Sequence, residues 1–269
     1  MTGAIPAAGT APDRLCRLRE TIENIQHFQF DKAKPPLLLG ARIASLPDSL
    51  LGGGLAFGAL HETAPERAFD FGAATGFTLA LAALSAKRGG ETLWIQTDYA
   101  RLEGGTIYGS GLDLFGLSSR RLLVLRVRRA IDALFAMEEA LKCRAISSVI
   151  AELPGDSADL TATRRLSLAA REQNGLGLLL RHRSSSMPSA AMTRWSVAAM
   201  CGARDEFGGL GRTSFQLSLM KNRRGACGRM SIAWDHHECV FVPGPTAEPS
   251  DLVAMAAAPA DRSPVAALA

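Results

Sequence analysis

Residues 71–78 read FGAATGFT, and this stretch decides between two interpretations of the chain. A phosphate-binding loop, GxxxxGK[ST], uses backbone amides to cradle phosphates, a lysine to neutralise them and a hydroxyl to hold magnesium. Gly76 and Thr78 fit that pattern, but Phe77 occupies the position of the lysine. Losing one charge-assisted contact to phosphate costs about 1.5–3 kcal/mol, which alone would leave weak nucleotide binding possible.

The first glycine of the loop pattern is also replaced. Phe71 occupies its position and Gly72 comes one residue late, which puts bulk where the backbone must approach phosphate closely. One interpretation is therefore a degenerate phosphate loop that does not hydrolyse ATP. Its remaining residues are Gly72, Gly76, Phe77 and Thr78. The alternative is that residues 72–85 form only an apolar helix with a glycine-rich start.

Composition restricts the class of protein. A chain of 269 residues that is 47% hydrophobic can bury one substantial core. Its five cysteines form no CxxC pair, and their odd number argues against a disulfide framework, so we expect a reducing cytoplasm. The sequence has no run of about 18 apolar residues and no charged segment before an apolar run at its start. We therefore expect a soluble protein that is not exported.

Hydrophobic periodicity divides the chain into three parts. Residues 1–35 predict a helical arm over 12–28, and residues 243–269, rich in Pro and Ala, predict a disordered tail. Between them, residues 36–242 predict one α/β core, a mostly parallel sheet flanked by helices. Its expected strands lie near 56–61, 92–97, 147–153 and 177–182, and its expected helices near 72–87, 130–143 and 161–173. Strands near 195–201, 214–220 and 229–234 predict an antiparallel extension.

Four landmarks, in order along residues 36–241, resemble the core of RecA-type ATPases. LLGGGLAFGALHE at 50–62 resembles the turn and first strand that enter the phosphate loop. WIQTDYA at 94–100 resembles the strand that ends in a catalytic glutamate, with Asp98 as a shorter counterpart. SVIAELPG at 148–155 resembles the Walker B strand, with Ala151 or Glu152 in place of its aspartate.

The fourth landmark is LMKNRRG at 219–225, which resembles the segment that approaches nucleotide across the RecA filament interface. The resemblance implies an interface role for Lys221, Asn222 and Arg223. The arm adds an apolar face suited to a subunit or partner. That face consists of Leu15, Leu18, Ile22 and Ile25.

Together with the phenylalanine at the lysine position and TRWSV at 193–197, these landmarks resemble the ImuA family of RecA-like accessory proteins in SOS-induced bacterial mutagenesis. The resemblance implies a non-catalytic adaptor in translesion DNA synthesis. Its implied partners are ImuB, RecA, an error-prone DNA polymerase and DNA, in the cytoplasm at the nucleoid. Two alternatives remain open: a DNA-dependent ATPase that uses Lys221 or Arg223 from a neighbouring subunit, and a cell-division inhibitor of the SulA type.

Arginine carries most of the positive charge, and five arginines without an acid lie within residues 120–129. Each cluster could be a solvated face, but several in one fold favour an anionic partner. In a RecA-like core the loop at 181–191 falls where DNA-contacting loops emerge. The predicted DNA-binding residues are Arg164, Arg165, Arg181 and Arg183.

A metal site is not expected, because His236, His237 and Cys239 lack a second ligand pair at zinc spacing. Asp156 and Asp159 could serve as paired carboxylates for acid–base chemistry, but they precede a predicted helix and are expected to cap it. We expect Trp195 and Trp234 to be core aromatics rather than base-stacking residues.

Overall fold

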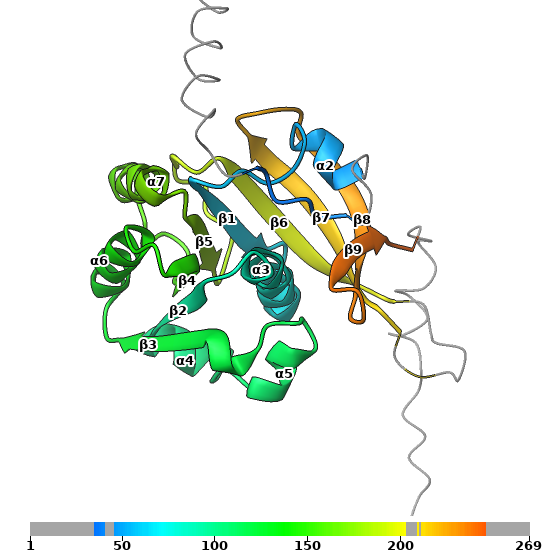
Figure 1. Cartoon of the computed structure of the whole chain (residues 1–269), viewed down its shortest axis with the longest axis horizontal. Coiled ribbons are helices and arrows are strands. Elements are labelled where there is room, and N and C mark those ends of the chain that lie inside the picture. Colours follow the sequence, from blue (N-terminus) through cyan, green and yellow to red (C-terminus); the bar gives the residue numbers. More distant parts are fainter. Residues whose placement is uncertain (1–34, 41–45, 203–208, 210, 246–269) are drawn as a thin grey trace, which may run out of the picture. The chain divides into compact units, whose positions relative to one another are not determined.

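The computed structural model describes residues 35–40, 46–202, 209 and 211–245. From Pro36 onward these residues belong to one compact unit (Figure 1). The apolar face of the predicted arm, at Leu15, Leu18, Ile22 and Ile25, lies outside the described residues, as does most of the predicted tail. Arm and tail therefore stay predictions.

One nine-stranded sheet organises the described unit, with the strand order β3-β2-β4-β5-β1-β6-β7-β8-β9. The strands are β1 (Ala59–Pro65), β2 (Glu91–Thr97), β3 (Leu122–Val127), β4 (Ile146–Leu153), β5 (Leu176–Arg181), β6 (Thr193–Met200), β7 (Thr213–Asn222), β8 (Gly228–Asp235) and β9 (Val240–Pro243). The first six strands in this order run parallel, and β7, β8 and β9 continue the sheet antiparallel. The prediction of a mostly parallel sheet with an antiparallel extension is confirmed.

Helices cover both faces of the sheet (Figure 1). They are α2 (Leu46–Leu50), α3 (Phe71–Ala86), α4 (Asp98–Gly104), α5 (Gly109–Asp113), α6 (Ala130–Leu141) and α7 (Leu160–Gln173). Side chains of α3 pack in the core on one face together with the antiparallel extension, whereas α6 and α7 form the core on the other face. Asp159 caps α7 as expected, because its carboxylate accepts the Ala162 amide at 2.7 Å. Asp156 does not cap this helix, since its carboxylate accepts the Ser185 hydroxyl instead.

Helix α3 is apolar on nearly all sides, and most of its residues are buried. A helix without a polar stripe is stable only where its whole circumference is packed. In the described part of the chain, Ala68–Ala86 is the one helical stretch long and apolar enough to cross a membrane, but 67% of its apolar window is buried in the fold. Packing within the unit therefore accounts for its composition.

The observed strands differ from the predictions in four ways. Strand β1 begins at Ala59, not near 56, because Gly58 turns the chain at a φ of 64°. Strand β3 was missed because its residues are partly or fully exposed, and β9 because it is short and ends in Pro243. Strand β6 belongs to the parallel part on one side, where it pairs with β1, and joins the antiparallel extension only through β7.

Candidate functional site at the carboxyl edge of the sheet

The parallel strands β1, β2, β4 and β5 end at the same edge of the sheet, where open α/β folds bind ligands. At this edge the connection from β1 to α3 occupies the place of a phosphate loop. It consists of residues 66–70, in which there is no glycine. Backbone amides therefore lack the glycines that let a loop wrap closely around phosphate.

The structure corrects the phosphate-loop interpretation of FGAATGFT. Helix α3 begins at Phe71, so the whole motif is helical. The residues assigned to the loop, Gly72, Gly76, Phe77 and Thr78, lie in the first half of this helix. The alternative of an apolar helix with a glycine-rich start is the one observed.

The side chain of Phe77 lies in the core and not at a nucleotide-binding surface. Its side chain is 0% exposed and packs edge-on against the rings of Trp195 and Phe215, with centroids 5.5 and 6.2 Å away. The Thr78 hydroxyl donates to the Ala74 carbonyl at 2.8 Å, so it serves the helix. Neither side chain points to a place where phosphate or magnesium could lie.

Asp70 places a carboxylate at the start of α3. It is buried, and it accepts the backbone amides of Arg67 at 3.2 Å and Ala199 at 2.9 Å. Because Ala199 belongs to β6, Asp70 ties the beginning of α3 to that strand. The Arg67 guanidinium lies 3.4 Å from the same carboxylate, so Asp70 serves the local structure of the connection between β1 and α3.

Of the two residues expected at the Walker B position, Ala151 and Glu152 of β4, only Glu152 carries a carboxylate, and it is 2% exposed. One carboxylate oxygen accepts the Trp94 indole N–H at 3.1 Å and the Gln96 amide at 3.0 Å. The other oxygen lies 2.9 Å from Nε2 of His182. Both oxygens are therefore engaged by side chains of the fold rather than turned to a free cation.

His182 is itself fixed by aromatic contacts. Its ring stacks on Phe71 with centroids 4.1 Å apart, and Tyr99 meets it edge-on at 5.9 Å. Gly104 lies so close to this group that a Cβ there would stand 2.8 Å from the Phe71 ring. The same group borders a pocket of about 310 Å³, which Phe71, Gly104 and Glu152 help to line. Asp98, the expected counterpart of a catalytic glutamate, lies apart from it as an exposed residue at the start of α4.

A second buried carboxylate, Glu62, lies in β1 and is 1% exposed. It accepts Arg181 of β5 at 3.2 Å, Arg194 of β6 at 2.9 Å and the Ser189 hydroxyl. Burial alone would raise the pKa of Glu62, but Arg181, Ser189 and Arg194 outweigh burial and hold it below its ordinary value. Glu62 is therefore a charged centre that joins three strands.

The prediction that Arg181 contacts DNA is wrong. Arg181 is 1% exposed, and besides Glu62 it donates to the carbonyls of Gly155 and Ala158. Its side chain turns inward because Glu62 supplies the opposite charge, and an arginine held in this way cannot reach a phosphate backbone. Nothing in its spacing along the sequence distinguishes it from an exposed arginine.

The loop between β5 and β6, residues 182–192, is fastened by Arg194 and Lys221. Arg194 donates to the carbonyls of Ser185 and Met187, at 3.0 and 2.8 Å. Lys221 donates to the Ser189 carbonyl. Arg183 stays exposed in this loop, where its aliphatic stem lies against Gly155. A loop expected to contact DNA is thus held by bonds within the chain.

The remaining predicted arginines have different surroundings. Arg165 on α7 forms an ion pair with Glu138 on α6 at 2.7 Å, with 61% of its side chain exposed. Arg164, its neighbour, lines a pocket together with Arg171 and Arg223. The structure therefore does not bring the four predicted DNA-binding residues together.

The segment expected at an interface makes contacts inside the unit. Asn222 donates to the Leu50 carbonyl at 2.7 Å, and Lys221 is held by the loop described above. The backbone amide of Arg223 donates to the Met192 carbonyl at 3.0 Å, but its guanidinium group is exposed. An interface role for this segment stays a prediction, and Arg223 has the most accessible side chain in it.

Several residues of these clusters were missed from the sequence. Glu62 is an acid within the buried strand ALHETAP, which could have signalled a buried partner. Arg171 follows Arg164 by two helical turns, which places both on one face of α7.

His236 lies 2.6 Å from the Leu114 carbonyl through Nδ1. In the ranges that the structure covers, no three His, Cys, Asp or Glu side chains gather in a way that could hold a metal ion.

The strand order and the two helical layers define a RecA-like α/β core. Among solved structures, the RadB recombinase is similar at 14% identity and a TM-score of 0.48, over 72% of this chain and 96% of that chain. No protein-family model matches the sequence.

Curated relatives are more informative. Two proteins called Protein ImuA, from Caulobacter vibrioides strains NA1000 / CB15N and ATCC 19089 / CIP 103742 / CB 15, are each 30% identical over 191 residues. The match covers 66% of this chain and 75% of each relative. The chain belongs to the ImuA family.

Proposed function

We propose that the protein is a non-catalytic RecA-like adaptor in damage-inducible translesion DNA synthesis. In this role it contacts ImuB, RecA and DNA and brings an error-prone DNA polymerase to damaged template. These contacts place it in the cytoplasm, at the nucleoid. Membership of the ImuA family supports the role in mutagenesis, and the geometry of the carboxyl edge supports the absence of catalysis.

The observation that carries the proposal is the burial of Phe77 in the core. Phosphoryl transfer depends on positive charge placed around the terminal phosphate. At the corresponding point this chain has a phenylalanine locked between Trp195 and Phe215. The RecA-like framework is kept while the groups that would act on ATP are used for packing.

The carboxylate at the Walker B position supports the same conclusion. Magnesium binding would require Glu152 to release donors that now satisfy both of its oxygens. Leaving those buried donors unpaired costs about 1–3 kcal/mol for each. The alternative of an ATPase completed by Lys221 in trans gains no support, because Lys221 donates to the Ser189 carbonyl of its own chain.

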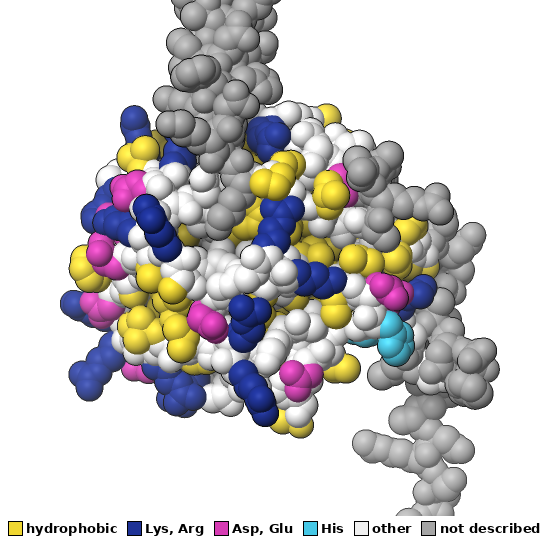
Figure 2. Space-filling model, viewed as in Figure 1, with side chains coloured by type: hydrophobic (Ala, Val, Ile, Leu, Met, Phe, Trp, Pro, Cys, Tyr) yellow, Lys and Arg dark blue, Asp and Glu magenta, His cyan; other side chains and the backbone are white. Residues whose placement is uncertain are grey.

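DNA contact is proposed through exposed arginines and phosphates, without reading of sequence. Arg183 is an exposed arginine in the loop at 182–192, and the five arginines within residues 120–129 are exposed along and beside the edge strand β3. Figure 2 shows lysine and arginine side chains spread over the face that it presents. Such a distribution supports weak, salt-sensitive association more than a single specific groove.

Two measurements on the purified full chain test the proposal. Phosphate release with single-stranded DNA present should stay below about 0.01 per second, far under typical enzyme turnover. The tagged protein should capture ImuB from damaged cells. Faster turnover would favour the ATPase, and capture of a tubulin-like division protein without ImuB would favour a division inhibitor.

A further inference from the structure

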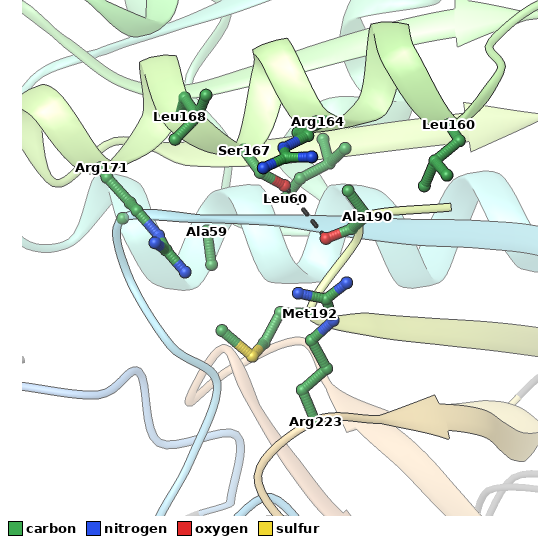
Figure 3. A pocket seen from close by; sticks show the side chains of 11 residues that line it. Ala59, Leu60, Leu160, Arg164, Ser167, Leu168, Arg171, Ala190, Met192 and Arg223 are labelled. Carbon is green, nitrogen blue, oxygen red and sulfur yellow. Dashed lines mark hydrogen bonds between the residues drawn. The ribbon is translucent and has the colours of Figure 1, made fainter. Parts of the chain in front are cut away.

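A pocket of about 330 Å³ opens beside α7, at the amino-terminal end of β1. Figure 3 shows three arginine side chains turned into it, Arg164 and Arg171 from the helix above and Arg223 from the end of β7 below. Among the described residues, no aspartate or glutamate lines it. This pocket lies away from the carboxyl-edge clusters, and nothing in the proposed function uses it.

The helix supplies one amphipathic face to the pocket. Leu160, Arg164, Leu168 and Arg171 recur at spacings of three or four residues, so they align along one side of α7. Both leucines are about half exposed, at 49% and 52%. The opposite side of the helix holds its buried residues, Thr163, Leu166, Ala169 and Ala170. The pocket face is therefore available to a ligand without loss of core packing.

The floor of the pocket is fixed by backbone hydrogen bonds. The Met192 amide donates to the Leu60 carbonyl at 2.7 Å, and the Arg223 amide donates to the Met192 carbonyl at 3.0 Å. The Ser167 hydroxyl donates to the Ala190 carbonyl at 3.2 Å, which ties α7 to the same segment. These bonds hold the two walls of the pocket in place, so little ordering is required when a ligand enters.

The three guanidinium groups have no carboxylate partner among the described residues, unlike Arg181 and Arg194, which share Glu62. A group of arginines without acids is an electrostatic cost for the free protein and is relieved by bound anions. Arginine suits carboxylate and phosphate equally, because its planar fork donates two parallel hydrogen bonds to either. Charge alone therefore leaves both ligand classes open.

The lining between the arginines favours a peptide over a nucleic acid. Single-stranded nucleic acid binds through stacking of bases on aromatic rings, and none of the pocket's lining residues that the structure describes is aromatic. Its uncharged walls are mostly aliphatic, and they include the adaptable side chain of Met192. Such a surface accepts an aliphatic or thioether side chain while arginines at the rim meet carboxylates.

We infer that this pocket binds an acidic peptide segment of a partner protein. One large apolar side chain of the peptide enters between Leu168 and Met192. Its flanking carboxylates pair with Arg164, Arg171 and Arg223. The volume lies at the lower end of the range for ligand pockets, about 300–1,000 Å³, as suits a single anchoring side chain.

The test is fluorescence anisotropy of the full chain with a labelled peptide in which one leucine lies between aspartates and glutamates. Arg164→Ala, Arg171→Ala and Arg223→Ala should each weaken binding about tenfold or more, the loss of one charge-assisted hydrogen bond. Leu168→Gln should also weaken it, because the apolar contact is lost. The matched control is Arg165→Ala, which removes a neighbouring exposed arginine of α7 outside the pocket and should leave affinity unchanged.

Two further probes decide the class of ligand. The same peptide with asparagine and glutamine in place of its acids should bind at least tenfold more weakly, as one lost charge-assisted hydrogen bond would give. Equal binding of both peptides, no saturable binding, or wild-type affinity in all three arginine variants would overturn the inference. So would binding of a single-stranded oligonucleotide, but not of the peptide, that the same substitutions abolish. Phosphate release and ImuB capture report on the proposed function separately.

Discussion

Arginine side chains are paired with a carboxylate in one region of this molecule and lack a described carboxylate partner in another. In the interior, Arg181 and Arg194 converge on Glu62, and Arg181 also donates to two backbone carbonyls. In the pocket beside α7, three arginines face one another with no described carboxylate among them. In the first region the arginine charges hold strands together through ion pairs, whereas in the second region they are available to bind a ligand.

The same contrast applies to the carboxylates. Glu62 and Glu152 lie near the edge where a RecA-like ATPase performs its chemistry, yet donors within the chain satisfy both. Polar residues in a fold of this class therefore do not by themselves indicate catalysis. Whether a charge is satisfied internally decides between a structural and a binding role.

The largest effect is expected from placing a new charge inside the closed region. Phe77→Lys puts an ammonium group into a core position that is 0% exposed and has no carboxylate beside it. We expect destabilisation of more than about 4 kcal/mol and no gain of ATP hydrolysis. Urea unfolding measures the effect, and Phe77→Leu, costing about 1.5 kcal/mol or less, is the matched control. A stable lysine variant that releases phosphate would restore the phosphate-loop interpretation.

Removing Arg181 should separate the two kinds of arginine directly. Arg181→Ala leaves Glu62 buried with one partner fewer, and breaking a buried ion pair costs about 3–5 kcal/mol. Arg164→Ala in the open pocket should change unfolding free energy by about 0.5 kcal/mol or less. Equal effects in the two variants would show that the contrast does not hold.

A pH titration sharpens the comparison through His61, next to Glu62 on β1. Burial lowers the pKa of His61 to about 4, from 6.5, and the charge of Arg224 adds to this, against a hydrogen bond to the Ala56 carbonyl that raises it. The unfolded chain therefore binds the extra proton between pH 6.5 and 4 while the folded chain does not. Stability should fall as pH falls through that window.

The expected loss across the window is about 3 kcal/mol, at 1.36 kcal/mol for each unit of pKa difference. Thermal melting from pH 7 to 4 measures it. His61→Gln removes the titrating group and should flatten the dependence there, while the decline caused by Glu62 at lower pH remains. An unchanged pH profile in His61→Gln would assign the effect to another group.

The smallest effect concerns DNA. Arg183 is exposed in the loop between β5 and β6, so Arg183→Ala should reduce the slope of log K against log salt by about 0.7 for single-stranded DNA. Binding titrations at several salt concentrations give this slope. If it is unchanged while Arg120 and Arg121 variants reduce it, the contact lies near β3 rather than in the loop.

Local patterns were sufficient for most elements of the core. The apolar period of residues 71–86, the alternating strands and the capping Asp159 all depend on neighbours within a few residues. Strand β3 was not predicted, because an exposed edge strand flanked by arginines has no buried face and so no alternating apolar pattern. From the sequence alone, a helix over FGAATGFT was one of two interpretations, the other being a degenerate phosphate loop. Glycine and threonine occur in both settings.

The sequence by itself determined that the chain is an α/β protein with landmarks that resemble RecA-type cores, that a phenylalanine stands where a phosphate loop would carry its lysine, and that arginine is its main positive charge. Only the tertiary structure decided which arginines are free. Arg181 faces inward because a carboxylate from another strand meets it. Arg223 lines the same pocket as Arg164 and Arg171 because its backbone, just after β7, is hydrogen-bonded to Met192. Such pairings join residues far apart in the chain, and no local spacing encodes the distance between them.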